Sequence, residues 1–270
     1  MSNIRVGNRS TRKLPIYQRS HSNKFSLAID QAFQVSYSIP MRLPFHKSDN
    51  FTGRDREISE IHKVLHCADA TTSQRRVMVL HGLGGMGKTQ LAIQYAYIHQ
   101  KDYTSVWWVN ASTTQSLSQG FLRIAQQLLA YHTKKTKAGL KLDSASIAVA
   151  LGLPPDTGNR NGELNASGDI IGTVVKSIIS WFAAEDNGWV LIFDNYDDLK
   201  NMNIFNFLQP GSSGSILITS RSRDTCCNGA GKVTLICVNT LCYVHMCNSA
   251  GKVTLMCVNT LCYVHMKSRT

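Results

Sequence analysis

The chain has 270 residues, 43% of them hydrophobic and 17% charged, which gives it enough length for a full core and the composition of a soluble globular protein. Its formal net charge of +12 comes from the two ends, because residues 1–29 and 225–270 hold ten Lys/Arg and no Asp or Glu. Residues 30–224 keep the other nineteen of the 29 basic residues and all 17 acidic ones. This near-neutral middle argues against a basic nucleic-acid groove across the folded body.

The N-terminal segment is polar and basic, and we expect residues 1–44 to be a disordered tail. The start "MSNIRVGNRSTRKLPIYQRSHSNK" also has the Arg- and Ser-rich composition of a mitochondrial transit peptide, but Pro15 and the lack of an apolar helix face speak against that alternative. No run of residues approaches the roughly 18–20 apolar positions of a membrane span. Without a secretory signal, the eight cysteines are expected to stay reduced in the cytoplasm.

From residue 51 onward, segments of helical periodicity alternate with short apolar runs typical of buried strands. A segment rich in Lys, Pro, Gly and Asn at 133–168 predicts a surface insertion with one short helix. Helices are expected at 51–66, 89–100, 116–130, 144–151 and 170–184, and strands at 75–82, 105–112, 188–195 and 214–222. This order predicts an α/β fold, a three-layer sandwich in which helices cover both faces of a mostly parallel sheet.

A phosphate-binding motif lies between the first predicted strand and the helix after it. Residues 82–89, "GLGGMGKT", match G-x-x-x-x-G-K-[ST], and the strand–loop–helix context is the one that the motif requires. The glycines let successive backbone N–H groups point at phosphate oxygens, assisted by the helix N-terminus. Lys88 would reach the β- and γ-phosphates, and the Thr89 hydroxyl would bind Mg²⁺. The alternative is a glycine-rich turn that only happens to precede a helix.

Two later strands end in charged residues suited to the same site. Asp194 ends "WVLIFD" and is placed to hold Mg²⁺; the alternative is a solvated carboxylate. Asn195 follows at the position where hydrolytic relatives often carry a second acid, and an amide cannot accept a proton from water. Arg221, just after "ILITS", is placed to sense the γ-phosphate at the carboxyl edge of the sheet, unless it is a surface arginine.

The segments "FTGRDRE", "VMVLHGLGGMGKTQLA", "VWWVNAS", "WVLIFDN" and "GSILITSR" occur in this order. Together they resemble the NB-ARC type of STAND nucleotide switch, which is found in plant resistance proteins, apoptotic protease-activating factors and fungal NOD-like receptors. The form "FDNYDD" is most similar to the fungal branch. The resemblance covers about 45–224 and predicts a nucleotide-binding domain over 45–238.

The resemblance implies a site for ADP or ATP with Mg²⁺. It would place Phe51, Thr52 and Arg54 beside the adenine and ribose. Lys88, Asp194 and Arg221 would be the catalytic residues, with Arg221 as a sensor, and Thr89 and Asp194 would bind the metal. The phosphates would lie against the loop and the first turn of its helix: Gly82, Leu83, Gly84, Gly85, Met86, Gly87, Lys88, Thr89 and Gln90.

The same resemblance implies a signalling switch that changes conformation when ADP is exchanged for ATP, hydrolyses slowly or not at all, and self-associates or pairs with related receptors. The family's Gly-Leu-Pro-Leu and Met-His-Asp motifs have no counterpart, so we expect a switch truncated after its nucleotide-binding core. Two alternatives stay open: a conventional turnover ATPase similar to AAA+ proteins, and a non-functional or interaction-only fragment.

The C-terminal region is a tandem repeat, since residues 227–246 and 247–266 are nearly identical. The first copy, through "GKVTLICV" at 231–238, is expected to supply a fifth core strand. The second copy, 247–266, is expected to be irregular and outside the domain, followed by a tail at 267–270. Each copy carries C-x₄-C-x₂-H, and the first triplet is Cys237, Cys242 and His245. A zinc site there is a weak alternative, because duplication copies ligands without adding independent support and the spacing is unusual for zinc.

Overall fold

A computed structural model gives the structure of the chain. It describes residues 39–49, 51–66, 75–136, 144–154, 157, 168–184, 188–198, 204 and 214–222, and then the strands 233–237, 242–247, 252–257 and 260–264. The predicted disordered tail covers residues 1–44. Residues 1–38 of that tail lie outside the description. The Cys and His side chains proposed as a zinc site also lie outside the description.

The described elements follow the predicted order of helices and strands. The helices are α2 (Asp55–Leu65), α3 (Lys88–His99), the 3₁₀ turn η1 (Gln100–Asp102), α4 (Thr114–Thr136), α5 (Ser144–Ala150) and α6 (Gly168–Ala184). The strands are β1 (Arg76–His81), β2 (Ser105–Asn110), β3 (Trp189–Asp194), β4 (Ser215–Ser220), β5 (Val233–Cys237), β6 (Cys242–Cys247), β7 (Lys252–Cys257) and β8 (Thr260–Val264).

The strands form one sheet in the order β2-β3-β4-β1-β5-β6-β7-β8. All pairings among the first five are parallel. Ile218 of the central strand β4 is paired with Val79 of β1 on one side and with Phe193 of β3 on the other. Because β4 lies between β1 and β3, the carboxyl ends of these three strands meet at one edge. Ligands bind at that edge in open α/β sheets.

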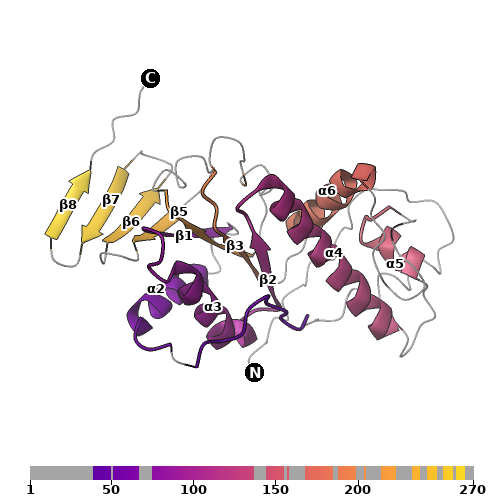
Figure 1. Cartoon of the computed structure of the whole chain (residues 1–270), viewed down its shortest axis with the longest axis horizontal. Coiled ribbons are helices and arrows are strands. Elements are labelled where there is room, and N and C mark those ends of the chain that lie inside the picture. The colour runs from indigo at the N-terminus through magenta and orange to yellow at the C-terminus, as the bar shows by residue number, and fades with distance from the viewer. Residues whose placement is uncertain are drawn as a thin grey trace, which may run out of the picture.

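Helices cover both faces of the sheet, as Figure 1 shows. Side chains alternate along each strand, so Val79 joins the core under α4 and α6 while Met78 and Leu80 join the core under α2 and α3. In β2, Trp107 belongs to the first core and Val106 to the second. Two apolar cores on opposite faces of one sheet confirm the predicted three-layer α/β sandwich.

Helix α4 is longer than its periodicity suggested and extends into the segment predicted as an insertion. His132 and Thr133 are both buried, and the Thr133 hydroxyl donates a 2.8 Å hydrogen bond to the carbonyl of Leu129. Burial therefore carries the helix through to Thr136. The short helix expected near 144–151 is present as α5.

The C-terminal repeat is where the fold departs most from expectation. Strand β5 pairs in parallel with β1, which confirms the predicted fifth core strand. The expectation of an irregular repeat is wrong, because β6, β7 and β8 continue the sheet as antiparallel strands. Each copy is rich in β-branched residues and supplies two strands. The backbone N–H and C=O groups of neighbouring strands form hydrogen bonds with each other. The boundary predicted at residue 238 stays a prediction.

Within the described ranges, no helix is both long enough and apolar enough to cross a membrane.

Candidate functional site

The loop between β1 and α3 has the backbone shape of a phosphate cradle. Gly85 and Gly87 have φ angles of 79° and 84°, in the left-handed region that favours glycine. A Cβ atom at either position would meet nothing within 4 Å, so it is the backbone conformation that requires glycine here. The carbonyl of Gly87 accepts the first helical hydrogen bond, from the N–H of Leu91 at 2.8 Å. The loop thus leads directly into the N-terminus of α3 and leaves open space above it.

The side chain of Lys88 lies inside this loop. Its Nζ donates hydrogen bonds to the carbonyls of Gly82 and Leu83, both at 2.7 Å, and the residue is only 9% exposed. A buried ammonium needs such partners because desolvation of a charge is costly. The two contacts hold the positive charge close to the loop that would bind phosphate.

Asp194 connects three segments at the sheet edge. Its Oδ1 accepts hydrogen bonds from the hydroxyls of Thr89, at 2.8 Å, and Thr219, at 2.6 Å, and the residue is 8% exposed. The carboxylate therefore joins the first turn of α3 to the ends of β3 and β4. The 2.8 Å between the Thr89 and Asp194 oxygens is close to the edge of about 3 Å in an octahedron with metal–oxygen bonds of 2.0–2.1 Å.

Arg221 and Asp197 form an ion pair at the rim. The Nε of Arg221 lies 3.1 Å from Oδ2 of Asp197, and its backbone N–H donates to Oδ1 at 2.6 Å. The Arg221 side chain is 65% exposed, and its guanidinium lies 3.9 Å from where a Cβ of Gly84 would stand. A cation is thereby held beside the phosphate loop by the segment that follows β3.

Lys88, Thr89, Thr219 and Arg221 are among the residues that line one cavity of about 310 Å³, within the usual size range of small-molecule sites. The lining comes from the loop, the start of α3, the end of β3 and the end of β4: Gly84, Gly85, Met86, Gly87, Lys88, Thr89, Gln90, Asn195, Thr219, Ser220 and Arg221. A glycine loop and a buried lysine at this cavity, with Asp194 hydrogen-bonded to the lining residue Thr89, make up a site for a nucleoside polyphosphate.

The model of the AAA ATPase domain family matches residues 50–210. The chain belongs to this family of P-loop ATPase domains. The match runs from the segment before α2 past the end of β3, so it contains the loop, Lys88 and Asp194. This part of the chain is therefore a nucleotide-binding domain.

A curated relative of this AAA ATPase domain is a nucleotide-binding leucine-rich repeat (NLR)-like protein of Hyaloscypha variabilis. The two are 26% identical over 203 residues, which are 74% of this chain and 18% of the relative. The chain thus spans less than a fifth of the relative's length. Together with the family match, this relative confirms the predicted resemblance to STAND-type P-loop ATPases of fungal NLR proteins.

Two solved structures from Aeropyrum pernix share a limited likeness with the domain. The ORC1 protein in complex with DNA is 18% identical, with a TM-score of 0.34 over 67% of this chain and 42% of that one. The ORC2 protein in its ADPNP–ADP complexes is 12% identical, with a TM-score of 0.36 over 67% of this chain and 45% of that one. Both TM-scores are below 0.5, so neither likeness bears on function.

The predicted adenine-binding residues lie in the segment before α2 and do not line the cavity. Phe51 is half-buried and packs against the core under α2 and α3, while Thr52 is exposed. Arg54 adopts φ 65° at the start of α2, and its Nη1 donates a 2.8 Å hydrogen bond to Oε1 of Glu57. Their role toward the base stays a prediction.

The contact between Asn195 and Thr219 was not predicted from the sequence. The backbone N–H of Asn195 donates to the Thr219 hydroxyl at 2.8 Å, with Asn195 at φ 65°. Thr219, which the sequence analysis missed, is 1% exposed. A threonine directly after the apolar run "ILI" in "SILITS", near the carboxyl end of the strand, is the signal that would have found it. Asp197, the next acid along the chain after Asp194, pairs with Arg221 and does not line the cavity.

Proposed function

We propose that the chain is the ADP- and ATP-binding core of a signalling switch of NB-ARC type, in which nucleotide exchange changes conformation and hydrolysis is slow or absent. The observation that carries the proposal is the hydrogen-bonded group Thr89–Asp194–Thr219 beside a glycine loop that encloses Lys88. That arrangement suits a polyphosphate with a divalent metal ion.

The nucleotide phosphates would be held by backbone N–H groups of the loop and by Lys88. Thr89 and Asp194 would hold Mg²⁺, because hydroxyl and carboxylate oxygens are its preferred ligands and the two side chains are already in contact. When bound, Mg²⁺ would neutralise phosphate charge. Thr219 donates a second hydrogen bond to the same Oδ1 of Asp194, so the acid would be positioned before ligand binding.

Arg221 would report which nucleotide is bound. Its exposed guanidinium lies beside Gly84 of the loop while its backbone and side chain bond to Asp197. A third phosphate would compete with the Asp197 carboxylate for the guanidinium. Because Asp197 lies just after β3 and Arg221 just after β4, exchanging this partner would change how the two segments are tied together.

Slow hydrolysis is proposed because of the residue after Asp194. Asn195 lines the cavity, but its amide cannot take a proton from an attacking water. Asp197, the acid two positions on, is bonded to Arg221. Among the described residues that line the cavity, none is an Asp or Glu, so bound ATP would persist and suit a switch better than a turnover enzyme.

Membership of the AAA ATPase domain family favours a second candidate, a conventional turnover ATPase. The discriminating quantity is the steady-state rate of ATP hydrolysis. Turnover above about 1 s⁻¹, within the usual range for enzymes, would support the turnover ATPase. Nucleotide binding with much slower turnover would support the switch.

Because the chain spans 18% of its NLR-like relative, the activity of a whole receptor is also a proposal. We propose that the domain acts in the cytoplasm and associates with itself or with related receptors when ATP is bound. The test is to denature the purified chain, identify the released nucleotide by chromatography, and measure association by light scattering with ADP or ATP. The remaining alternative, a fragment that binds no nucleotide, predicts empty protein and no effect of either nucleotide.

A further inference from the structure

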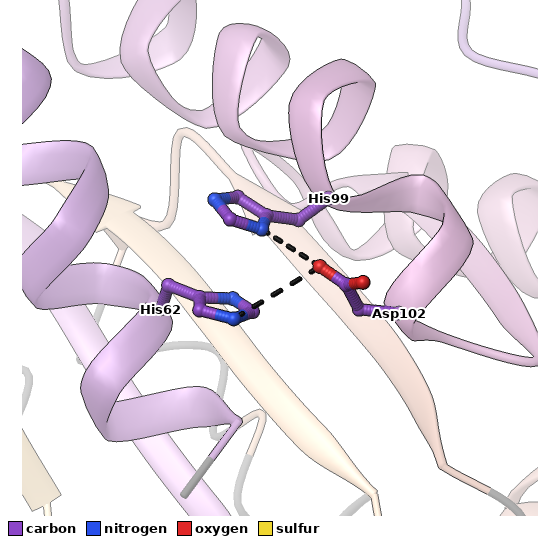
Figure 2. A group of neighbouring side chains, drawn as sticks. All are labelled: His62, His99 and Asp102. Atoms are coloured by element: carbon purple, nitrogen blue, oxygen red, sulfur yellow. Dashed lines mark hydrogen bonds and ion pairs between the residues drawn. The ribbon is translucent and has the colours of Figure 1, made fainter.

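A second cluster of metal-binding side chains lies away from the nucleotide site. His62 comes from α2, His99 ends α3, and Asp102 ends the 3₁₀ turn η1 that follows it. Their ligand atoms all lie within 4.8 Å of one another, and Figure 2 shows both histidines directed toward the same carboxylate. The cluster is at the opposite end of α3 from Lys88, about 16 Å along a helix of this length.

The distances within the cluster suit one small ion. The Nδ1 of His99 and Oδ2 of Asp102 lie 2.8 Å apart, a hydrogen bond that a bound ion would replace, and Nε2 of His62 lies 3.9 Å from the same oxygen. Two ligand atoms on a tetrahedral zinc ion with bonds of 2.0–2.1 Å are about 3.3 Å apart. These two distances lie on either side of that value, so the side chains must rearrange before all three can bind one ion.

The two imidazole rings are stacked, with centroids 3.8 Å apart and planes 15° apart. Rings so nearly parallel do not direct their nitrogen lone pairs at one point, so one ring must turn before both can bind the same metal ion. His62 is suited to turn because its Nδ1 is buried and has no hydrogen-bond partner among the described residues. Its one polar contact, with Asp102 at 3.9 Å, is long.

The ligand types also suit a metal ion. Two imidazoles and one carboxylate are ligands that zinc accepts, with a fourth position for water.

We propose that His62, His99 and Asp102 bind a zinc ion that ties α2 to the C-terminal end of α3. His66, directly after the end of α2, stacks on His62 with centroids 4.9 Å apart and is exposed, so it borders the site without being needed as a ligand. The ion would join the helix that starts at Asp55 to the helix that starts at Lys88. This site is separate from the nucleotide site and does not depend on the proposed function.

The test is zinc binding by the full chain, measured by equilibrium dialysis, with thermal melts with and without Zn²⁺. We expect His99→Ala and Asp102→Asn each to weaken zinc binding by more than about tenfold, and Zn²⁺ to raise the melting temperature of the wild type but not of Asp102→Asn. His46→Ala, which removes an exposed histidine from the 39–49 segment, is the matched control and should bind zinc normally. Asp102→Asn conserves shape, and its melt without zinc shows whether it folds.

The cysteines of the C-terminal repeat are competing ligands, so the design must separate the two sites. A Cys237→Ser/Cys242→Ser variant should keep the zinc that His99→Ala loses. Co²⁺ in place of Zn²⁺ should give no sulfur-to-metal charge-transfer band. Equal zinc binding and equal stabilisation by zinc in the wild type, His99→Ala and Asp102→Asn would overturn the proposal, as would a loss of zinc confined to the cysteine variant.

Discussion

The hydroxyl of Thr89 donates a 2.8 Å hydrogen bond to Oδ1 of Asp194, although 105 positions separate the two residues in the sequence. This contact joins the first turn of α3 to the end of β3. It brings together the two residues predicted to bind a metal ion, one from the P-loop motif and one from the strand end expected to serve that motif.

Replacing Asp194 by Asn tests that assignment. An amide oxygen still accepts hydrogen bonds from hydroxyl groups, but it carries no charge to attract Mg²⁺. We expect Asp194→Asn to bind ADP equally well with Mg²⁺ and with a chelator, whereas the wild type binds more tightly with Mg²⁺. Titration calorimetry under both conditions measures this, and Asp49→Asn on the exposed 39–49 segment is the control. A variant that keeps the full Mg²⁺ enhancement would show that Asp194 is not the metal ligand.

Thr219→Val tests the support behind Asp194. The buried hydroxyl donates to Asp194 and accepts from the N–H of Asn195, so valine removes both bonds at nearly constant volume. Unpaired polar groups of this kind cost about 1–3 kcal/mol. We expect the free energy of unfolding to fall by that amount in urea denaturation. Thr173→Val, on an exposed face of α6, should change it by less than about 0.5 kcal/mol.

Two glycines offer a matched test of backbone conformation. Gly87 has φ 84° and Gly172 lies within α6, and in neither case would a Cβ meet an atom within 4 Å. We expect Gly87→Ala to destabilise the fold by about 1–2 kcal/mol through strain and to weaken nucleotide binding. Gly172→Ala should stabilise it by about 0.5–1 kcal/mol. If both variants shift the unfolding midpoint in the same direction, the left-handed conformation at Gly87 is not what requires glycine.

Asn195→Asp addresses the proposed slow hydrolysis. The backbone of Asn195 is left-handed, with φ 65°, a conformation that Asp also tolerates, so the substitution should leave the fold intact. An acid at this position could accept a proton from water, and we expect ATP turnover to rise by about a hundredfold or more. Phosphate release measured at saturating ATP gives the result. Turnover unchanged from the wild type would mean that another feature limits hydrolysis.

The local parts of the site could be read from the sequence because they depend on neighbouring residues. Glycine spacing and apolar runs predicted the loop after β1 and the strand that ends at Asp194. The contacts of Thr219 could not be predicted, because they depend on β4 lying beside β3, and that order arises from the whole sheet. The ion pair between Asp197 and Arg221 could not be predicted for the same reason, because it requires the ends of β3 and β4 to meet.

The metal cluster could not be predicted from the sequence either, because it forms through tertiary packing. His62 and His99 each looked like part of an ordinary amphipathic helix, and only the packing of α2 on α3 brings them to Asp102. The C-terminal repeat was misread for a different reason. Its strand-like composition was visible, but whether the second copy would pair with the first depends on backbone hydrogen bonding between copies, which composition does not encode.

Nucleotide binding through Lys88 is tested most directly by titration calorimetry of ADP with Mg²⁺ into the wild type and Lys88→Ala. Lys88 holds its charge inside the loop through two carbonyl contacts, so its loss should remove the main cation at the phosphates. We expect binding by the wild type, an affinity more than about tenfold lower for Lys88→Ala, and normal affinity for the exposed-site control Lys63→Ala. Equal affinity in the wild type and Lys88→Ala, or no binding by the folded wild type, would contradict the assignment of this loop as the nucleotide site.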